Sequence, residues 1–253
     1  MKLQNEIALV TGGGSGIGAA IATHFKEKGA EIALLDIASD KLYQQAEKIG
    51  AAPFICDITK GEDAILVMEE ICKKVGIPRI LVNAAGILGS GKILSKDGPM
   101  DLNYFSNVLS VNLIGAFNML RLAAAKIASL NALDDNERGV IINIGSIAAE
   151  EGQIGQAAYS AAKAGLAGLT LPAARELARW GIRVVTIAPG LVETNMLHAL
   201  SPEVKEALAQ TIPFPQRLAR PEEIAMLAAH IVKNSMLNGS VLRIDGALRM
   251  GAR

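Results

Sequence analysis

Short runs of almost wholly apolar residues alternate along this chain with longer stretches in which apolar residues recur at helical spacing. Strands that a parallel sheet buries on both faces have this near-continuous apolar character, whereas strands with one wet face alternate. The pattern predicts seven strands, at residues 6–11, 31–36, 52–57, 79–86, 139–146, 182–190 and 240–246.

The segment between the first two strands shows the helical spacing, and Gly29 ends the predicted helix. Its shared apolar face consists of Ile17, Ala20, Ile21, His24 and Phe25. Parallel strands need such crossovers, and these are nearly always right-handed. We therefore expect an α/β fold, a Rossmann-type doubly wound parallel seven-stranded sheet with helices on both faces.

Two stretches without strand character follow predicted strand ends, at residues 88–101 and 191–220. Ligands of open α/β sheets bind outside the carboxyl ends of the strands, so these stretches are the candidate substrate loops. The chain shows no linker, repeat or low-complexity tract, and its 253 residues suit one well-filled unit. We predict a single domain over residues 1–253.

Composition narrows the classes of partner. Lysine plus arginine equals aspartate plus glutamate, 25 against 25, so no one-signed field favours nucleic acid. No apolar run approaches the roughly 20 residues that a membrane span needs, and the first residues lack a signal-peptide core. We expect a cytoplasmic protein with neither nucleic-acid nor membrane partners.

The cysteines and histidines carry no recognisable metal pattern. Cys56 and Cys72 form no CxxC pair, and we interpret them as reduced structural thiols. His24, His198 and His230 are far apart in the sequence and are not spaced as ligands, so we predict no metal site. His198 lies in a candidate substrate loop, where a solvated position is favoured over contact with substrate.

A glycine-rich turn, TGGGSGIG at residues 11–18, follows the first strand and opens the first helix. Gly12, Gly16 and Gly18 would let the backbone approach a pyrophosphate held by the helix N-terminus. A glycine-rich turn alone is also typical of a plain strand-to-helix connection. Asp36 ends the second strand about 20 residues later, where a carboxylate can bind ribose hydroxyls, and this favours a dinucleotide site.

The neighbours of that carboxylate indicate which dinucleotide binds. Ile37 and Ala38 follow Asp36, and Ser15 stands inside the glycine turn, so no cation is placed to receive a 2′-phosphate. The sequence therefore predicts NAD rather than NADP.

Tyr159 and Lys163 are four residues apart among small neighbours and share one helix face. An ammonium about 4 Å away would lower the pKa of a phenol by up to roughly three units. Ser146, at the end of the fifth predicted strand, can donate a hydrogen bond to a substrate oxygen. We predict that these three side chains meet in a catalytic site.

The ordered motifs TGGGSGIG, NAAG, VNL, YxxxK and APG, together with Ser146, resemble those of the short-chain dehydrogenase/reductase family over nearly the whole chain. The resemblance implies that Ser146 orients the substrate oxygen and that Tyr159 is the general acid/base. It also implies that Lys163 holds the nicotinamide ribose and that Asn112 supports a proton-relaying water.

The same resemblance extends the cofactor site beyond the glycine turn and Asp36. The implied cofactor contacts are Gly12, Ser15, Gly16, Ile17, Gly18, Asp36, Asp57, Ile58, Asn83, Ala84, Tyr159, Lys163, Pro189, Val192 and Thr194.

Longer phrases are similar to a subgroup of this family, the type II 3-hydroxyacyl-CoA dehydrogenases, some of which also oxidise hydroxysteroids. They include LTLPAAREL with Pro172, PFPQRL, and LNGSVLRIDGALRM near the C-terminus. The expected reaction is hydride transfer between NAD and a short or methyl-branched 3-hydroxyacyl-CoA. Gln156 is placed to donate to the thioester carbonyl, and basic residues of 205–220 to meet the CoA phosphates.

Three alternatives remain at this stage. The chain could be a hydroxysteroid or other secondary-alcohol dehydrogenase, a 3-oxoacyl carrier-protein reductase, or an NAD-binding protein without catalysis. The intact Ser, Tyr and Lys set disfavours the last of these. The small-residue and leucine-rich faces of residues 100–130 and 156–179 resemble the family's pairing helices and imply a homotetramer.

Overall fold

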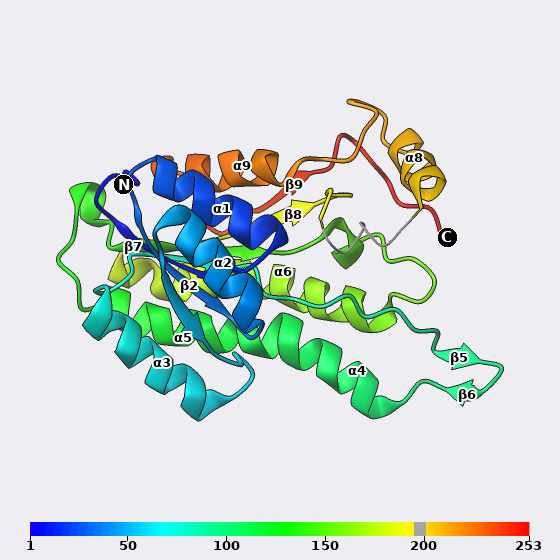
Figure 1. Cartoon of the computed structure of the whole chain (residues 1–253), viewed down its shortest axis with the longest axis horizontal. Helices are drawn as coiled ribbons and strands as arrows, with labels where there is room; N and C mark the ends of the chain where they lie inside the picture. The colour runs from blue at the N-terminus through cyan, green and yellow to red at the C-terminus, as the bar shows by residue number, and fades with distance from the viewer. Residues whose placement is uncertain (195–200, 253) are drawn as a thin grey trace.

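The computed structural model describes residues 1–194 and 201–252, and its centre is a seven-stranded parallel sheet (Figure 1). The strand order is β3-β2-β1-β4-β7-β8-β9, and every pairing in this sheet is parallel. The strands are β1 Ile7–Thr11, β2 Glu31–Asp36, β3 Ala52–Ile55, β4 Ile80–Asn83, β7 Gly139–Ile144, β8 Ile182–Pro189 and β9 Val241–Ile244. The predicted fold class and all seven predicted strands are confirmed, with ends that differ by up to three residues.

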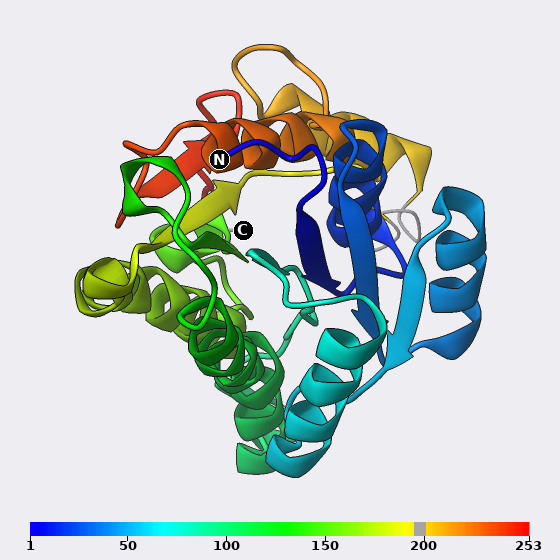
Figure 2. The same ribbon diagram turned by 90° about the vertical axis from the view of Figure 1, so that its left-hand side faces the viewer.

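Helices cover both faces of this sheet, as the view in Figure 2 shows. One face carries α1 Gly16–Glu27, α2 Ser39–Ile49 and α9 Pro221–Lys233. The other carries α3 Gly61–Lys74, α5 Ala116–Ile127 and α6 Ala157–Leu177. Each face of the sheet has its own hydrophobic core, and successive strand residues point to opposite faces. Val10 therefore packs in the core of the first face and Leu9 in that of the second.

The strand order reverses between β1 and β4, which are neighbours although β2 and β3 lie between them in the chain. Thr11 joins the ends of β1 and β4, because its hydroxyl accepts hydrogen bonds from the amides of Ala84 at 3.1 Å and Ala85 at 3.2 Å. A crevice outside the carboxyl ends of the strands forms where such an order reverses, and this is where open α/β sheets bind ligands.

The two candidate substrate loops contain regular structure that the sequence pattern did not predict. Residues 88–101 include a short antiparallel ladder between β5 Leu94–Ser95 and β6 Gly98–Pro99. Strands of two residues are too short to show any apolar period, which explains the omission. In the second loop, α8 Pro202–Gln210 begins after the Ser201 N-cap, whereas His198 lies outside the described residues.

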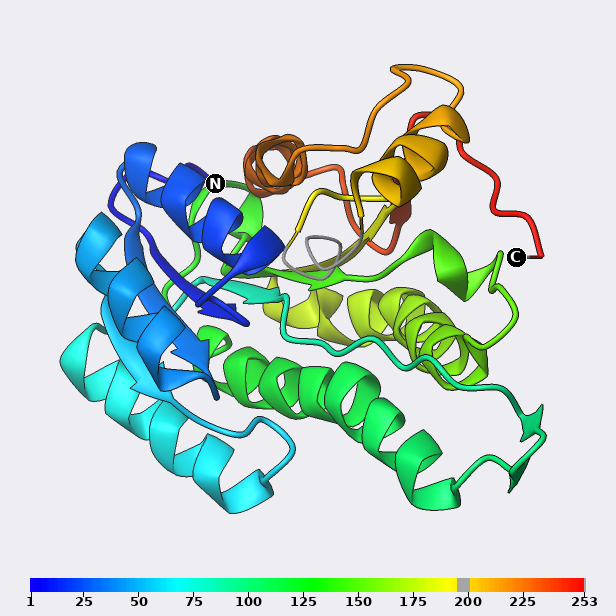
Figure 3. The same ribbon diagram turned by 45° about the vertical axis from the view of Figure 1, so that its right-hand side comes forward.

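A continuous helical rod follows the first loop and is built from α4 Leu102–Leu109, the π-helical segment η1 Ser110–Gly115, and α5 (Figure 3). By length and apolar composition, Leu102–Ile127 could cross a membrane, which corrects the expectation that no apolar segment is long enough. Half of its most apolar window is buried inside the protein, because α5 packs on the sheet through Met119, Ala123 and Ile127.

Candidate active site

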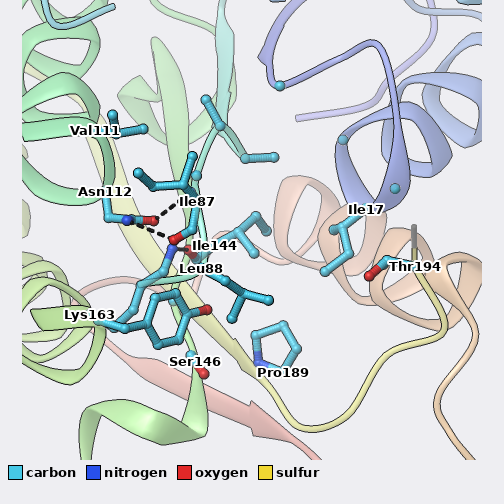
Figure 4. Close-up of a pocket in the computed structure, with 18 of the residues that line it drawn as sticks. Ile17, Ile87, Leu88, Val111, Asn112, Ile144, Ser146, Lys163, Pro189 and Thr194 are labelled. Carbon is cyan, nitrogen blue, oxygen red and sulfur yellow. Dashed lines mark hydrogen bonds between the residues drawn. The ribbon is translucent and has the colours of Figure 1, made fainter. Parts of the chain in front are cut away.

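A cavity of about 570 Å³ opens at the carboxyl ends of β1, β4, β7 and β8. Figure 4 shows Asn112, Lys163 and Ser146 on one side of it and Ile17 and Thr194 on the other. The predicted residues that line it are Gly12, Ser15, Gly16, Ile17, Gly18, Asp36, Asp57, Ile58, Ala84, Asn112, Ser146, Gln156, Tyr159, Lys163, Pro189, Val192 and Thr194. The fold therefore brings together side chains from nearly the whole length of the chain.

Asn83 is the predicted cofactor residue that does not line this cavity. Its side chain is buried in the sheet, where Nδ2 donates to the Ala116 carbonyl and to Oδ1 of Asn143, both at 3.0 Å. Asn83 and Asn143 are register partners on β4 and β7. This side chain points into the layer between the sheet and α5 and away from the cavity, and the cofactor contact expected at Asn83 stays a prediction.

The glycine turn leaves space that a side chain would fill. Gly12 and Gly16 have φ angles of 64° and 55°, a region that favours glycine. A Cβ atom at Gly12 would lie 2.7 Å from the Cα of Ala85, and one at Gly18 would collide with the Gly12 carbonyl oxygen. The turn therefore packs backbone against backbone and presents the first amides of α1 to the cavity, an arrangement that fits a pyrophosphate.

Backbone amides fix the carboxylate of Asp36 at the end of β2. Its Oδ2 accepts from the Gly14 amide at 3.0 Å, and its Oδ1 accepts from the Ala38 amide at 3.1 Å. Among the described residues that line the cavity, Lys163 is the sole lysine or arginine, and it bonds to β7, which is separated from β2 by β1 and β4. No described cation of the cavity wall therefore offsets the charge of Asp36.

Asp57 is oriented by Thr59, a lining residue that the sequence analysis did not single out. The carboxylate accepts from the Thr59 amide at 2.9 Å and from its hydroxyl at 2.7 Å, and the hydroxyl bond lowers the pKa of Asp57. Cys56 also lines the cavity, but burial raises the pKa of its thiol to about 11. That thiol stays neutral and inert at physiological pH, in keeping with a structural role.

Three elements bring the predicted catalytic side chains together. Ser146 follows β7 and caps a short helical turn, and its Oγ accepts from the Ala148 amide at 3.1 Å. Tyr159 and Lys163 occupy successive turns of α6, with the lysine Nζ 5.7 Å from the centre of the tyrosine ring. Lys163 is only 5% exposed, and its Nζ donates to the Ile144 carbonyl at 2.8 Å.

The pKa of Tyr159 departs from the prediction. Burial raises the pKa of its hydroxyl, and the hydrogen bond with Ser146 lowers it by less. Burial also lowers the pKa of the Lys163 amine to about 8. The expected net lowering of the tyrosine pKa by the lysine charge is therefore wrong for the protein alone, because both groups lose hydration on the same wall.

Asn112 sits in the π-helical segment η1, and irregular turns of this kind are frequent at functional sites. Its Nδ2 donates to the carbonyls of Ile87 and Val108 at 3.0 Å, and its Oδ1 accepts from the Ile87 amide at 3.3 Å. A Cβ atom at Gly86 would lie 2.6 Å from Oδ1 of Asn112 and 3.6 Å from Nζ of Lys163. The bare backbone of Gly86 is therefore what separates these two side chains.

Gln156 lines the cavity as predicted, but its amide is already engaged. Its Oε1 accepts from the backbone amide of Gln153 at 3.1 Å, and its Nε2 lies 3.4 Å from Oε1 of the same residue. Gln153 and Met250 also line the cavity, and sequence reasoning missed both because a single glutamine or methionine carries no chemical signal of its own. Only the fold brings Met250 to this place.

The basic residues of 205–220 do not line the cavity. Arg217 is paired with Glu223 through two hydrogen bonds of 2.9 and 2.7 Å, and the pKa of Glu223 falls to about 2. Arg217 is thus committed within the protein, which leaves Lys205 and Arg220 as the candidates for CoA phosphates. In residues 1–194 and 201–252, no group of three or more potential ligands could hold a metal ion, and the absence of a metal stays a prediction.

Comparisons with known proteins agree with this geometry. The family model described as short chain dehydrogenase matches residues 6–205. The 3-hydroxyacyl-CoA dehydrogenase type-2 of Drosophila melanogaster is 44% identical over 252 residues, covering 98% of this chain and 99% of the relative. The protein of the same name from Homo sapiens is 45% identical over 255 residues, covering 98% and 97%.

A solved structure is also similar. The crystal structure of 3-hydroxyacyl-CoA dehydrogenase type-2 from Mycobacterium avium superposes with a TM-score of 0.93 and 37% sequence identity, covering 98% of each chain. Fold and sequence similarity therefore extend together over nearly the full length of this chain.

Proposed function

This chain belongs to the short chain dehydrogenase family, and on that premise we propose that it is an NAD-dependent 3-hydroxyacyl-CoA dehydrogenase. The observation that carries the proposal is the meeting of Ser146, Tyr159 and Lys163 in one cavity with the glycine turn. The names of the relatives, 44–45% identical over nearly their full length, support the substrate class. The substrate is a short or methyl-branched 3-hydroxyacyl-CoA or the matching 3-ketoacyl-CoA.

The reaction is a reversible hydride transfer in which Tyr159 exchanges one proton. In oxidation, the Tyr159 phenolate accepts the proton of the substrate 3-hydroxyl as the C3–H bond breaks and the C3 carbonyl forms. Ser146 donates a hydrogen bond to the same oxygen and holds it against Tyr159. A nicotinamide bound in the cavity would supply the hydride acceptor, and its oxidised form would add a positive charge that favours the phenolate.

Lys163 and Asn112 support the proton transfer by Tyr159. Lys163 would hold the nicotinamide ribose and, through a water molecule, would pass the proton that Tyr159 accepts on to bulk solvent. Asn112 holds the Ile87 backbone through two hydrogen bonds and supports the water that continues this route. Hydrogen bonds to the backbone hold both the Lys163 and the Asn112 side chains in position.

The cofactor preference rests on Asp36. Its carboxylate, fixed by the amides of Gly14 and Ala38, is placed to accept from ribose hydroxyls and would repel a 2′-phosphate. The described cavity wall offers no lysine or arginine beside it to offset that repulsion. NAD is therefore the proposed cofactor. We expect the affinity for NADH to be at least about tenfold above that for NADPH, which corresponds to a repulsion of the 2′-phosphate of about 1.4 kcal/mol or more.

The protein is proposed to assemble as a homotetramer. Exposed apolar side chains of the helical rod and α6 support this, namely Ile114, Phe117 and Leu171, each more than 40% exposed. Sedimentation at a mass near four times 26.5 kDa is the expected result, and a monomer would contradict it.

A steady-state screen tests the proposed function. The substrates are acetoacetyl-CoA, longer and branched 3-ketoacyl-CoA esters, a carrier-protein thioester and a hydroxysteroid, each with both cofactors. We expect the highest kcat/KM for a 3-ketoacyl-CoA with NADH. Preference for the carrier-protein thioester with NADPH, or for the steroid, would overturn the substrate assignment and leave the family assignment intact.

A further inference from the structure

A small third hydrophobic cluster contributes Ile147, Leu191 and Met250 to the wall of the cavity. Its buried members are Ile147, Ile212 and Leu248, and Leu191, Leu218 and Met250 pack against them. Ile147 directly follows Ser146, whereas Leu248 and Met250 lie about 100 residues later, in a segment near the C-terminus (Figure 3). This 248–252 segment is thus part of the core that supports the catalytic serine.

Within this segment, Met250 lines the cavity itself. Its backbone amide donates to Oε2 of Glu151 at 3.0 Å, and two residues further on the Ala252 carbonyl accepts from the Ile154 amide at 2.9 Å. Both bonds join the 248–252 segment to the loop that precedes α6. That loop carries Gln153 and Gln156, which line the same cavity.

An ion-pair network holds the 248–252 segment against the rest of the protein. Glu151 pairs with Arg243 at 3.0 Å and with Arg249 at 3.3 Å, and Asp245 pairs with the same two arginines at 2.7 and 3.4 Å. Glu151 is 18% exposed and Asp245 9%, so water screens this network less than an open surface pair. Glu151 is therefore the group that joins the arginines to the Met250 backbone.

We propose that Met250 is a specificity-determining residue that forms the wall against the acyl chain, and that Glu151 is the positioning residue that holds it there. The proposal rests on the proposed function for its substrate. The surroundings of Met250 are the leucines and isoleucines of the third cluster, which suit an alkyl chain and offer nothing to a CoA phosphate. A thioether side chain of this flexibility fills an apolar wall and adjusts to chains of similar size.

The first test shortens this wall. Met250→Ala removes apolar contacts from a short substrate and makes room for a longer one. We expect the ratio of kcat/KM for 3-ketooctanoyl-CoA over acetoacetyl-CoA to rise about tenfold, the effect of a methylene or two in an apolar pocket. The NADH dissociation constant stays at the wild-type value. Met236→Ala, at a methionine that is 88% exposed, is the matched control and leaves the ratio unchanged.

The second test addresses Glu151 with its neighbour as control. Glu151→Gln weakens the arginine pairs and the bond to the Met250 amide, so it is expected to raise KM for acetoacetyl-CoA about fivefold with kcat and NADH affinity retained. Glu150→Gln removes a 64% exposed carboxylate that pairs with Arg243 but makes no bond to Met250. It is expected to leave KM unchanged.

A parallel series with 2-butanone and 2-octanone separates failure of this inference from failure of the proposed function. Turnover of ketones without turnover of thioesters would overturn the proposed function. The ratio of kcat/KM for 2-octanone over 2-butanone in Met250→Ala would then decide whether Met250 sets the chain length. An unchanged chain-length ratio in Met250→Ala, with wild-type activity on either series, would overturn the inference alone. Absence of turnover in both series would overturn both.

Discussion

Lys163 holds a charge in a place that disfavours it. The side chain is 5% exposed, burial lowers the pKa of its amine to about 8, and the hydrogen bond to Ile144 compensates only in part. The proposed function accounts for a lysine at this position, because Lys163 would hold the nicotinamide ribose there. The free-energy cost of the buried amine has a measurable dependence on pH.

We expect Lys163→Met to unfold with a higher free energy than wild type at pH 7, by roughly 1–3 kcal/mol, because one pKa unit corresponds to about 1.4 kcal/mol. The unfolded chain keeps the lysine proton to about pH 10.5, whereas the folded protein releases it near pH 8. Between these values the unfolded state binds more protons, so wild-type stability rises with pH relative to the variant. The difference in free energy of unfolding between Lys163→Met and wild type, here called the gap, is therefore largest below pH 8 and shrinks toward pH 10.5.

Urea unfolding of both proteins at pH 7 and pH 10 measures this gap. Lys48→Met, at an exposed lysine of α2, is the control and should show no such pH-dependent gap. A Lys163→Met gap that is the same at both pH values would contradict a buried amine with a lowered pKa.

At the scale of elements, the join between β1 and α1 depends on glycine at more than one position. A Cβ atom at Gly18 would meet the Gly12 carbonyl oxygen, a backbone atom that has no freedom to rotate away. We expect Gly18→Ala to lower the free energy of unfolding by about 1–3 kcal/mol, the usual cost of overpacking, and to weaken NADH binding at least tenfold. Thermal unfolding and fluorescence titration measure the two effects.

Gly61→Ala provides the control for that substitution. Gly61 opens α3, and a Cβ atom there meets nothing within 4 Å. The variant should bind NADH as the wild type does. Wild-type NADH affinity in Gly18→Ala would show that the tight turn is not needed for the cofactor.

Elements with a strong pattern could be predicted from the sequence, and those set by local contacts could not. The apolar runs of β7 and β8 are buried along their whole length, so their pattern predicted strands unambiguously. The π-helical turn at Asn112 is different, because it arises where the helical rod packs on α6 and leaves no mark on the apolar period. The β5–β6 ladder is too short for any period to show.

At the scale of the whole molecule, the same distinction holds for the site. Motifs predicted the residues near the cofactor turn and on α6, since each motif is a short continuous stretch of the chain. Met250 reaches the cavity only through contacts between distant segments, and the Asn83 side chain turns into the sheet core. The pKa of Tyr159 depends on how much hydration the whole fold removes, which no local spacing reveals.

The central claim of the proposed function is that Tyr159 transfers one proton as hydride transfer takes place. The most direct measurement is the rate of NADH oxidation by acetoacetyl-CoA in wild type and Tyr159→Phe, with NADH affinity determined for both. We predict that the wild type turns over and that the variant loses at least about a thousandfold in kcat while binding NADH normally, because the ring stays and only the proton is lost. A variant that keeps more than about a tenth of wild-type turnover would contradict the central claim.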